Sequence, residues 1–181
     1  VLAIAIECGI DPLDCAALIP RLKGAPGRME SVECGQDFTA LVDYAHTPDA
    51  VRNVIATARE FTSGKVVAVL GCGGDRDASK RPLMGSTLIE ESGIAIFTSD
   101  NPRSEDPAKI LEDMSNHLPI NAPSRVVIDR HEAIAYAVSL CQSGDTLLVL
   151  GKGHENGQEI KGKKIDFDDR LVLAKILEES Q

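Results

Sequence analysis

The sequence lacks the features that mark several common protein classes. It has no run of about 18 apolar residues, so we expect no segment to cross a membrane as a helix. Basic residues are in the minority, since 19 Lys and Arg stand against 28 Asp and Glu, for a formal charge of −9. Because the acids are spread along the chain, this balance argues against nucleic acid as the main partner.

Paired cysteines are also missing. The cysteines are odd in number, widely spaced and without a CxxC pair: Cys8, Cys15, Cys34, Cys72 and Cys141. This pattern indicates neither a disulfide framework nor a zinc site, and it fits a reducing cytoplasm best. Cys72 lies in a glycine-rich loop without an assignable base beside it, so a nucleophilic role for it is only a minor alternative.

The N-terminal stretch VLAIAIECGI is apolar but has no initiator methionine, basic flank or small-residue cleavage site, so we expect no signal peptide. Apolar positions at helical spacing around Gly9 and Pro12 predict one or two short helices in residues 1–20. The stretch RLKGAPGRME then predicts a linker. We therefore expect the tail of a preceding domain and a linker over residues 1–35, a compact domain over 36–181, and a chain that is a fragment.

Short apolar runs rich in β-branched residues recur through the compact domain. Five of them predict buried strands: FTALVDY, KVVAVLG, IAIFTS, RVVID and DTLLVLG. Helices are expected at residues 48–62, 80–92, 106–118, 130–142 and 168–179, with Pro48, Pro82 and Pro107 near helix starts. The alternation predicts an α/β, Rossmann-like, doubly wound and mostly parallel sheet. The stretch QEIKGKKIDFDD predicts a small hairpin around Gly162.

The loops that follow the predicted strands are all polar and charged. They are DYAHTPD (43–49), GCGGDRDASKRP (71–82), SDNPRSEDP (99–107), DRHEA (129–133) and GKGHENGQ (151–158). In a parallel sheet, ligands bind at the carboxyl ends of the strands, where loop N–H groups and helix N-termini converge. The binding site is therefore expected in this set of loops.

Two arginines in these loops invite a functional interpretation. Arg76 follows a flexible glycine pair and Arg103 follows a proline, so each could present a planar guanidinium to a ligand. A surface ion pair is the alternative. Its partners would be Asp75 or Asp77 for Arg76, and Glu105 or Asp106 for Arg103.

Acids in the same loops complete a possible ligand site. Asp43, Thr47 and Asp100 could simply cap helices. However, arginines that bind a carboxylate, beside Asp100 or Glu155 binding an amine, would suit a zwitterionic ligand.

The sequence does not encode a complete ATP site. GCGGDRD lacks the spacing of the dinucleotide fingerprint, and no GKS or GKT occurs. Lys152 and His154 could still reach a phosphate, or could be ordinary solvated loop residues. His117 and His131 are expected to be structural or solvated, and the spacing of His46 and His154 to other ligand types predicts no metal site.

Taken as an ordered set, these motifs resemble the C-terminal domain of the Mur ligases. The matching stretches are GRME (27–30), DYAHTPDA (43–50), GCGGDRDASKRPLMG (71–85), SDNPRSEDP (99–107), GKGHE (151–155) and FDDR (167–170). The resemblance implies a bacterial, cytoplasmic ligase in which other domains bind the UDP-N-acetylmuramoyl dipeptide. ATP and Mg²⁺ would be bound mainly by the central domain. Residues 1–20 resemble the tail of that domain.

The DNPR sequence resembles that of family members that add meso-diaminopimelate to the peptidoglycan stem peptide. The resemblance implies that diaminopimelate is bound by Arg76, Asp100, Asn101, Pro102, Arg103, Gly151 and Glu155. It implies nucleotide contacts for Arg28, Asp43, His46 and Lys80. No residue of this chain is expected to act as a nucleophile or metal ligand.

The activity implied is ATP-dependent amide bond formation, in which the amine of diaminopimelate attacks an acyl phosphate. This domain's share would be to hold the amine in line. Two alternatives are a ligase of the same superfamily that adds lysine or glutamate, and a non-enzymatic anion-binding module on the same fold.

Overall fold

The structure is a computed structural model that describes residues 2–19 and 24–180. Its centre is a six-stranded sheet in the order β1-β2-β6-β3-β4-β5. The strands are β1 (Glu30–Ser31), β2 (Thr39–Asp43), β3 (Val66–Leu70), β4 (Ile94–Phe97), β5 (Arg125–Val126) and β6 (Thr146–Leu150). Strands β2 to β6 are paired in parallel, and only β1 joins its neighbour in the antiparallel direction.

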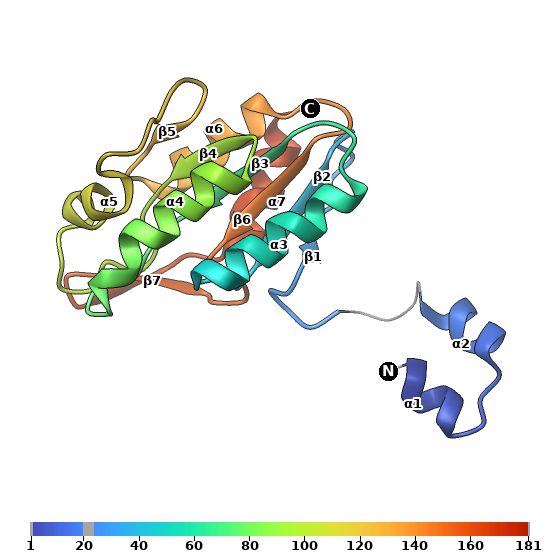
Figure 1. Ribbon diagram of the computed structural model, residues 1–181. Coiled ribbons are helices and arrows are strands. Elements are labelled where there is room, and N and C mark those ends of the chain that lie inside the picture. The colour runs from blue at the N-terminus through green and yellow to red at the C-terminus, as the bar shows by residue number, and fades with distance from the viewer. Residues whose placement is uncertain (1, 20–23, 181) are drawn as a thin grey trace.

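Helices cover both faces of this sheet. They are α3 (Pro48–Phe61), α4 (Arg81–Glu91), α5 (Pro107–Ser115), α6 (Arg130–Leu140) and α7 (Asp169–Glu179), with a 3₁₀ turn, η2 (Ala78–Lys80), leading into α4. Figure 1 shows α3 and α4 in front of the sheet and α6 and α7 behind it. The fold is therefore the predicted α/β, doubly wound arrangement.

The central strands are buried on both faces because successive side chains point to opposite sides. In β3, Ala68 and Leu70 join the core beneath α3, α4 and α5, whereas Val67 and Val69 join the core beneath α6 and α7. This explains why the strands appear in the sequence as continuous apolar runs instead of alternating ones.

Four of the five predicted strands and all five predicted helices are confirmed to within a few residues. The prediction of a buried strand at RVVID is wrong, since β5 is a two-residue strand at the sheet edge with both residues exposed. At the edge only one neighbour, β4, is available for pairing. Ile128, just beyond β5, is 50% exposed.

The predicted hairpin is confirmed as β7 (Gly157–Ile160) paired with β8 (Lys163–Asp166). Lys161 and Gly162 form its turn, both at positive φ. The hairpin lies at the end of the sheet where β6 stops, and the parallel bridge between Arg103 and Ile160 joins it to the loop after β4. This contact brings the C-terminal hairpin into the predicted site.

The N-terminal region contributes two helices and the first strand of the sheet. The predicted N-terminal helices are α1 (Leu2–Glu7) and α2 (Pro12–Leu18), which stand apart from the sheet in Figure 1. Residues 30 and 31, from the stretch expected to precede the compact domain, form β1 and pair with β2. The position of the domain boundary itself remains a prediction.

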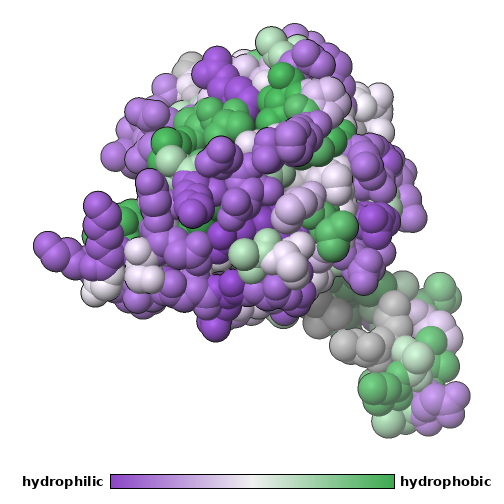
Figure 2. All heavy atoms as spheres, turned by 60° about the vertical axis from the view of Figure 1, so that its left-hand side comes forward, coloured by the Kyte–Doolittle hydropathy of each residue, from purple (hydrophilic) through white to green (hydrophobic). Residues whose placement is uncertain are grey.

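The surface is mixed in character. In Figure 2, hydrophilic residues cover much of the face shown, and apolar side chains form patches on the upper part of the main body and on the small helical segment. Ile4 is 70% exposed and Leu13 is 80% exposed. Within residues 2–19 and 24–180, no helix has the length and apolar character needed to span a bilayer.

Candidate functional site

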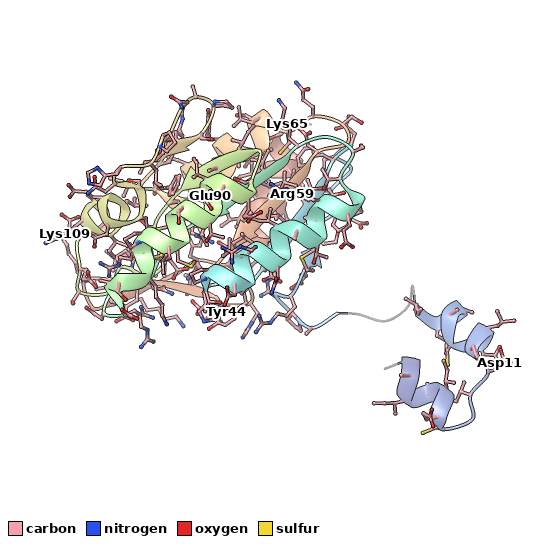
Figure 3. All side chains as sticks on the ribbon, viewed as in Figure 1. Asp11, Tyr44, Arg59, Lys65, Glu90 and Lys109 are labelled. Carbon is pink, nitrogen blue, oxygen red and sulfur yellow. The ribbon has the colours of Figure 1, made fainter. Side chains whose placement is uncertain are left out.

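The polar loops meet at one end of the sheet, as the parallel topology requires. Figure 3 shows Tyr44, which follows β2, at the opposite end of the molecule from Lys65, which precedes β3. A cavity of about 440 Å³ opens among the loops that follow β2, β3, β4 and β6. Eight of the residues predicted to bind ligands line it: His46, Arg76, Lys80, Asp100, Asn101, Arg103, Gly151 and Glu155.

Asn101 is held in one orientation by the loops around it. Its side-chain oxygen accepts hydrogen bonds from the Glu159 backbone N–H at 3.0 Å and from the Lys152 ammonium at 3.3 Å. Its amide nitrogen donates to a Glu155 carboxylate oxygen at 2.8 Å. Asn101 thus connects the loops after β4 and β6 to the hairpin.

Arg103 is fixed by its backbone as well as by its side chain. Its N–H donates to the Glu159 carbonyl at 2.8 Å, and its own carbonyl accepts from Lys161. The residue has a φ of 53°, an uncommon conformation for a non-glycine residue. With its backbone held in this way, Arg103 lines the cavity.

The Arg103 guanidinium is only partly used by the protein. Nη1 donates to the Gly74 carbonyl at 2.7 Å, and Nε lies 3.7 Å from the Glu159 carboxylate. The expected alternative, pairing with Glu105 or Asp106, is wrong, because the Glu105 carboxylate accepts from Arg81 at 2.7 Å instead. Among the described residues Nη2 has no hydrogen-bond partner, so it can bind a ligand.

Arg76 lies across the same cavity in the loop after β3. No carboxylate of the described chain comes within 4.0 Å of its guanidinium, so the expected pairs with Asp75 and Asp77 are not formed as salt bridges. Asp75 instead accepts hydrogen bonds from the backbone N–H and the hydroxyl of Ser104. These bonds, and the nearby charges of Arg103 and Arg76, lower the pKa of Asp75. The cavity therefore carries two guanidinium groups with free donors.

Asp100 and Gly151 approach each other at the floor of the site. A Cβ added to Gly151 would lie 2.8 Å from a carboxylate oxygen of Asp100, and Gly151 has a φ of 110°. Burial raises the pKa of Asp100, while the positive charges of Arg130 and Lys152 oppose that rise. Only glycine fits at 151, for both its conformation and its clearance.

Glu155 faces the cavity with a carboxylate that its neighbours already stabilise. Burial acts to raise its pKa, but the hydrogen bond from Asn101 and the charge of Lys152 outweigh it and hold the pKa below its ordinary value. Glu155 therefore presents a charged carboxylate to an amine of a ligand.

The suggestion that Lys152 reaches a phosphate is wrong. Its side chain is fully buried and its ammonium donates to the Gly157 carbonyl at 2.7 Å and to Glu155 at 3.2 Å. It cross-links the GKGHE loop to the start of the hairpin. His154, by contrast, is exposed.

The residues predicted to contact nucleotide divide into two groups. Three side chains lie around the Tyr44 ring. The Arg28 guanidinium is 4.9 Å from the ring centroid, and the ring centroids of His46 and His154 are 4.7 and 5.7 Å away. These groups form an exposed, mixed aromatic and basic surface beside the cavity.

Asp43 is instead used inside the protein. It is buried, and its two oxygens accept from the backbone N–H groups of Met29 and Ala45. It anchors the GRME turn, so its predicted nucleotide contact would have to be made without breaking these bonds. Lys80 lines the cavity and lies 3.9 Å from Asp77.

Pro102 does not line the cavity, although it was predicted to contact the amino acid. It is buried, and a Cβ on Gly74 would overlap its carbonyl. Its place is to fix the course of the loop between Asn101 and Arg103.

Two buried arginines were not predicted. Arg81, at the start of α4, pairs with Glu105 and Asp113 and lines the cavity. Arg130, at the start of α6, pairs with Asp169 behind it. Both lie in the polar loops that follow predicted strands, at 71–82 and 129–133, and this is the only signal in the sequence. A charged residue in the first turn of a helix is usually exposed, so burial was not expected.

Cys72 lines the cavity but is a poor nucleophile. Burial, together with the nearby charge of Asp100, raises its pKa to about 12. We expect a thiol-alkylating reagent at neutral pH to modify the exposed Cys8 and leave Cys72 unmodified, as mass spectrometry of peptides would show. Labelling of Cys72 as fast as Cys8 would contradict this assignment.

No cluster of three or more His, Cys, Asp or Glu able to hold a metal ion occurs within the part of the chain that the structure describes.

The groups that face a ligand in the cavity come from two arginines, one asparagine, two acids and one glycine: Arg76, Arg103, Asn101, Asp100, Glu155 and Gly151. Opposite charges at one cavity suit a ligand with both a carboxylate and an ammonium group.

Comparison with known proteins gives concordant results. Residues 27–153 match the family model described as Mur ligase, glutamate ligase domain. The 2,6-diaminopimelate ligase of Syntrophomonas wolfei is 46% identical over 97% of this chain and 36% of its own length. That of Streptomyces coelicolor is 48% identical over 96% of this chain and 35% of its own length.

Solved structures agree. A UDP-N-acetylmuramoyl-L-alanyl-D-glutamate–2,6-diaminopimelate ligase superposes with a TM-score of 0.84 at 40% identity, over 99% of this chain and 37% of that one. A folylpolyglutamate synthase/dihydrofolate synthase from Yersinia pestis, with a TM-score of 0.54 at 24% identity over 71% of this chain and 28% of that one, shares the fold alone. The chain spans about a third of the length of the curated relatives that it matches. This chain belongs to the Mur ligase family, and it carries that family's glutamate ligase domain.

Proposed function

We propose that this chain is the amino-acid-binding domain of UDP-N-acetylmuramoyl-tripeptide synthetase, the cytoplasmic ligase that adds meso-diaminopimelate to UDP-N-acetylmuramoyl-L-alanyl-D-glutamate. One observation carries the proposal: Arg76 and Arg103, each with free donors, share one cavity with Asp100 and Glu155. The relatives' printed names, which specify 2,6-diaminopimelate, support the same ligand.

The arginines would decide between diaminopimelate and lysine. The distal end of diaminopimelate carries a carboxylate, which gains charge-assisted hydrogen bonds from a guanidinium, whereas the lysine side chain ends in an ammonium group alone. An ammonium placed near Arg103 would be repelled and would lose its water without compensation. We assign Arg103 and Arg76 to the distal carboxylate, and Asp100, Asn101, Gly151 and Glu155 to the amino acid end.

The domain would contribute to catalysis by placement. The ligase forms an acyl phosphate from ATP and the D-glutamate carboxylate, and the amine of diaminopimelate attacks it. Holding that amine in line turns a bimolecular encounter into a near-unimolecular step, which is a large effect when the geometry is right. ATP and Mg²⁺, which would offset the phosphate charge, are assigned mainly to a domain outside this chain.

The surface around Tyr44 is assigned to the nucleotide. Arg28 is exposed beside the Tyr44 ring, and the exposed His46 and Lys80 line the cavity, so all three can meet phosphates or a base when the ATP-bearing domain closes over this one. Asp43 would act by holding the GRME turn, and thereby Arg28, in place.

Calorimetric titration of this chain with meso-diaminopimelate, beside L-lysine and inorganic phosphate, tests the proposal. We expect heat of binding with diaminopimelate and none with lysine. Preferential binding of lysine would instead favour a lysine-adding ligase. Binding of phosphate without either amino acid would favour an anion-binding module.

A further inference from the structure

A buried arginine behind the cavity is the strongest feature that the proposed function leaves unused. The side chain of Arg130 is completely inaccessible, and so is that of its partner Asp169. Nε and Nη2 of the guanidinium donate to the two carboxylate oxygens of Asp169 at 2.8 and 2.7 Å. This two-point contact fixes the plane and direction of the guanidinium.

The remaining donors of Arg130 reach two loops of the cavity. Nη1 donates to the Ser99 carbonyl at 3.1 Å, and Nη2 donates to the Leu150 carbonyl at 2.9 Å. These are the carbonyls of the residues directly before Asp100 and Gly151. One guanidinium therefore holds the starting points of both loops that form the floor of the cavity.

The sheet alone does not join these two points. Strands β4 and β6 are not neighbours, because β3 lies between them in the order β6-β3-β4. Arg130 spans this gap beyond the end of β3 and fixes how far the loop after β4 lies from the loop after β6. The separation matters, because a Cβ at Gly151 would already lie 2.8 Å from the Asp100 carboxylate.

We propose that Arg130 is a positioning residue of the amino acid site, which sets the separation of Asp100 and Gly151 by binding the Ser99 and Leu150 carbonyls together. Asp169 orients Arg130 for this task. The inference rests on the proposed function for the identity of the ligand, but not for the geometry of the two loops.

The chemistry of arginine is required in this arrangement. Four hydrogen bonds leave one guanidinium in three directions within a plane, to one carboxylate and two carbonyls. A lysine ammonium is a point donor that cannot span these acceptors. Arg130→Lys therefore keeps the buried positive charge and removes the bridge.

The charge also acts on Asp100, which faces several ionisable groups. Arg130 and Lys152 favour its ionised form, whereas Glu155 and Asp169 oppose it. Since Arg130→Lys preserves the sign of the charge, a change in ligand affinity in this variant reports on geometry more than on charge.

Two measurements on the 181-residue chain test the proposal. The first is the affinity of Arg130→Lys for meso-diaminopimelate, which we expect to fall by about tenfold or more, as is common when a residue that orients a ligand-binding group is lost. The second is amide hydrogen exchange at Gly151 and Glu159, whose N–H groups bond to Asp43 and Asn101. We expect exchange there to become faster in the variant.

Asp145→Asn serves as the matched control. Asp145 is buried at the opposite end of the sheet, where its carboxylate accepts from the N–H groups of Lys65 and Gln142. We expect this variant to speed exchange at Lys65 and Gln142 and to leave diaminopimelate affinity unchanged. A purely structural role for Arg130 predicts the pattern of the control for Arg130→Lys as well: faster exchange near the substitution, with unchanged affinity of the folded protein for diaminopimelate.

The outcomes separate the two proposals. Unchanged affinity in Arg130→Lys would overturn the positioning role of Arg130, and unchanged exchange at Gly151 and Glu159 would show that Arg130 does not hold the two loops. If the original chain binds no diaminopimelate, the proposed ligand fails for this chain and the exchange data alone decide on Arg130. If Arg130→Lys does not fold, Asp169→Asn, which keeps the arginine but weakens its orientation, is expected to show the same local increase in exchange.

Discussion

Replacing Arg103 with alanine is expected to abolish detectable binding of meso-diaminopimelate while the protein stays folded. Arg103 reaches the cavity from a backbone fixed by Glu159 and Lys161, and its Nη2 is free to bind a carboxylate. Loss of a charge-assisted contact in a partly buried site costs about 2–5 kcal/mol, or roughly thirty-fold to several thousand-fold in affinity. Calorimetric titration of the variant would measure this loss.

Arg52→Ala is a suitable control, because Arg52 is a similarly charged residue on α3 whose contacts are with Asp49 and Glu91 outside the cavity. We expect its affinity for diaminopimelate to match that of the original chain. Equal affinities for Arg103→Ala and Arg52→Ala would show that the guanidinium at 103 does not bind the ligand. Thermal unfolding of all three proteins would exclude a loss caused by misfolding.

Much of the fold follows from local features of the sequence. Runs such as VVAVL and TLLVL are apolar at every position because they are covered on both faces, and the prolines at 48 and 107 begin their helices as expected. The site also follows from topology, since every loop after a parallel strand is at the same end. Arg76, Asp100 and Arg103 could be expected to meet there without knowledge of any contact.

The uses of individual charges could not be predicted in the same way. Lys152 stands between two glycines in a loop, so an exposed side chain that binds a phosphate is a reasonable expectation. Its burial depends on Asn101, a residue 51 positions away, and on the carbonyl of Gly157. Likewise, the role of Arg130 depends on Asp169, which is 39 positions away and on another helix. Such pairings are tertiary, and no local pattern encodes them.

The exposed charges show the opposite limit. The sequence places acids beside Arg76 and Arg103 as alternative ion-pair partners, but in the structure these acids bind other groups. Glu105 is bound by Arg81, and Asp75 is bound by Ser104. Arg76 therefore has no carboxylate partner among the described residues, and Arg103 keeps a free Nη2 beside its 3.7 Å contact with Glu159.

Breaking the buried pair of Arg130 and Asp169 is expected to produce the largest loss of stability in this chain. Asp169→Ala leaves a guanidinium in a fully inaccessible position with two carbonyl partners but without its hydrogen-bonded counter-charge. Removal of one partner of a buried ion pair typically lowers the free energy of unfolding by about 3–5 kcal/mol. Urea unfolding followed by circular dichroism would measure the loss.

The double variant Arg130→Met with Asp169→Leu separates the charge from the packing. Two apolar side chains of similar volume remove both charges, so we expect it to be more stable than Asp169→Ala. Recovery should be incomplete, because the Ser99 and Leu150 carbonyls lose their donor and an unsatisfied buried acceptor costs about 1–3 kcal/mol. Lys175→Ala, which removes an exposed pair with Glu179 on the same helix, should change stability by no more than about 0.5 kcal/mol. If Asp169→Ala were as mild as Lys175→Ala, the guanidinium would have another way to satisfy its charge, and the buried pair could not be what holds the two loops together.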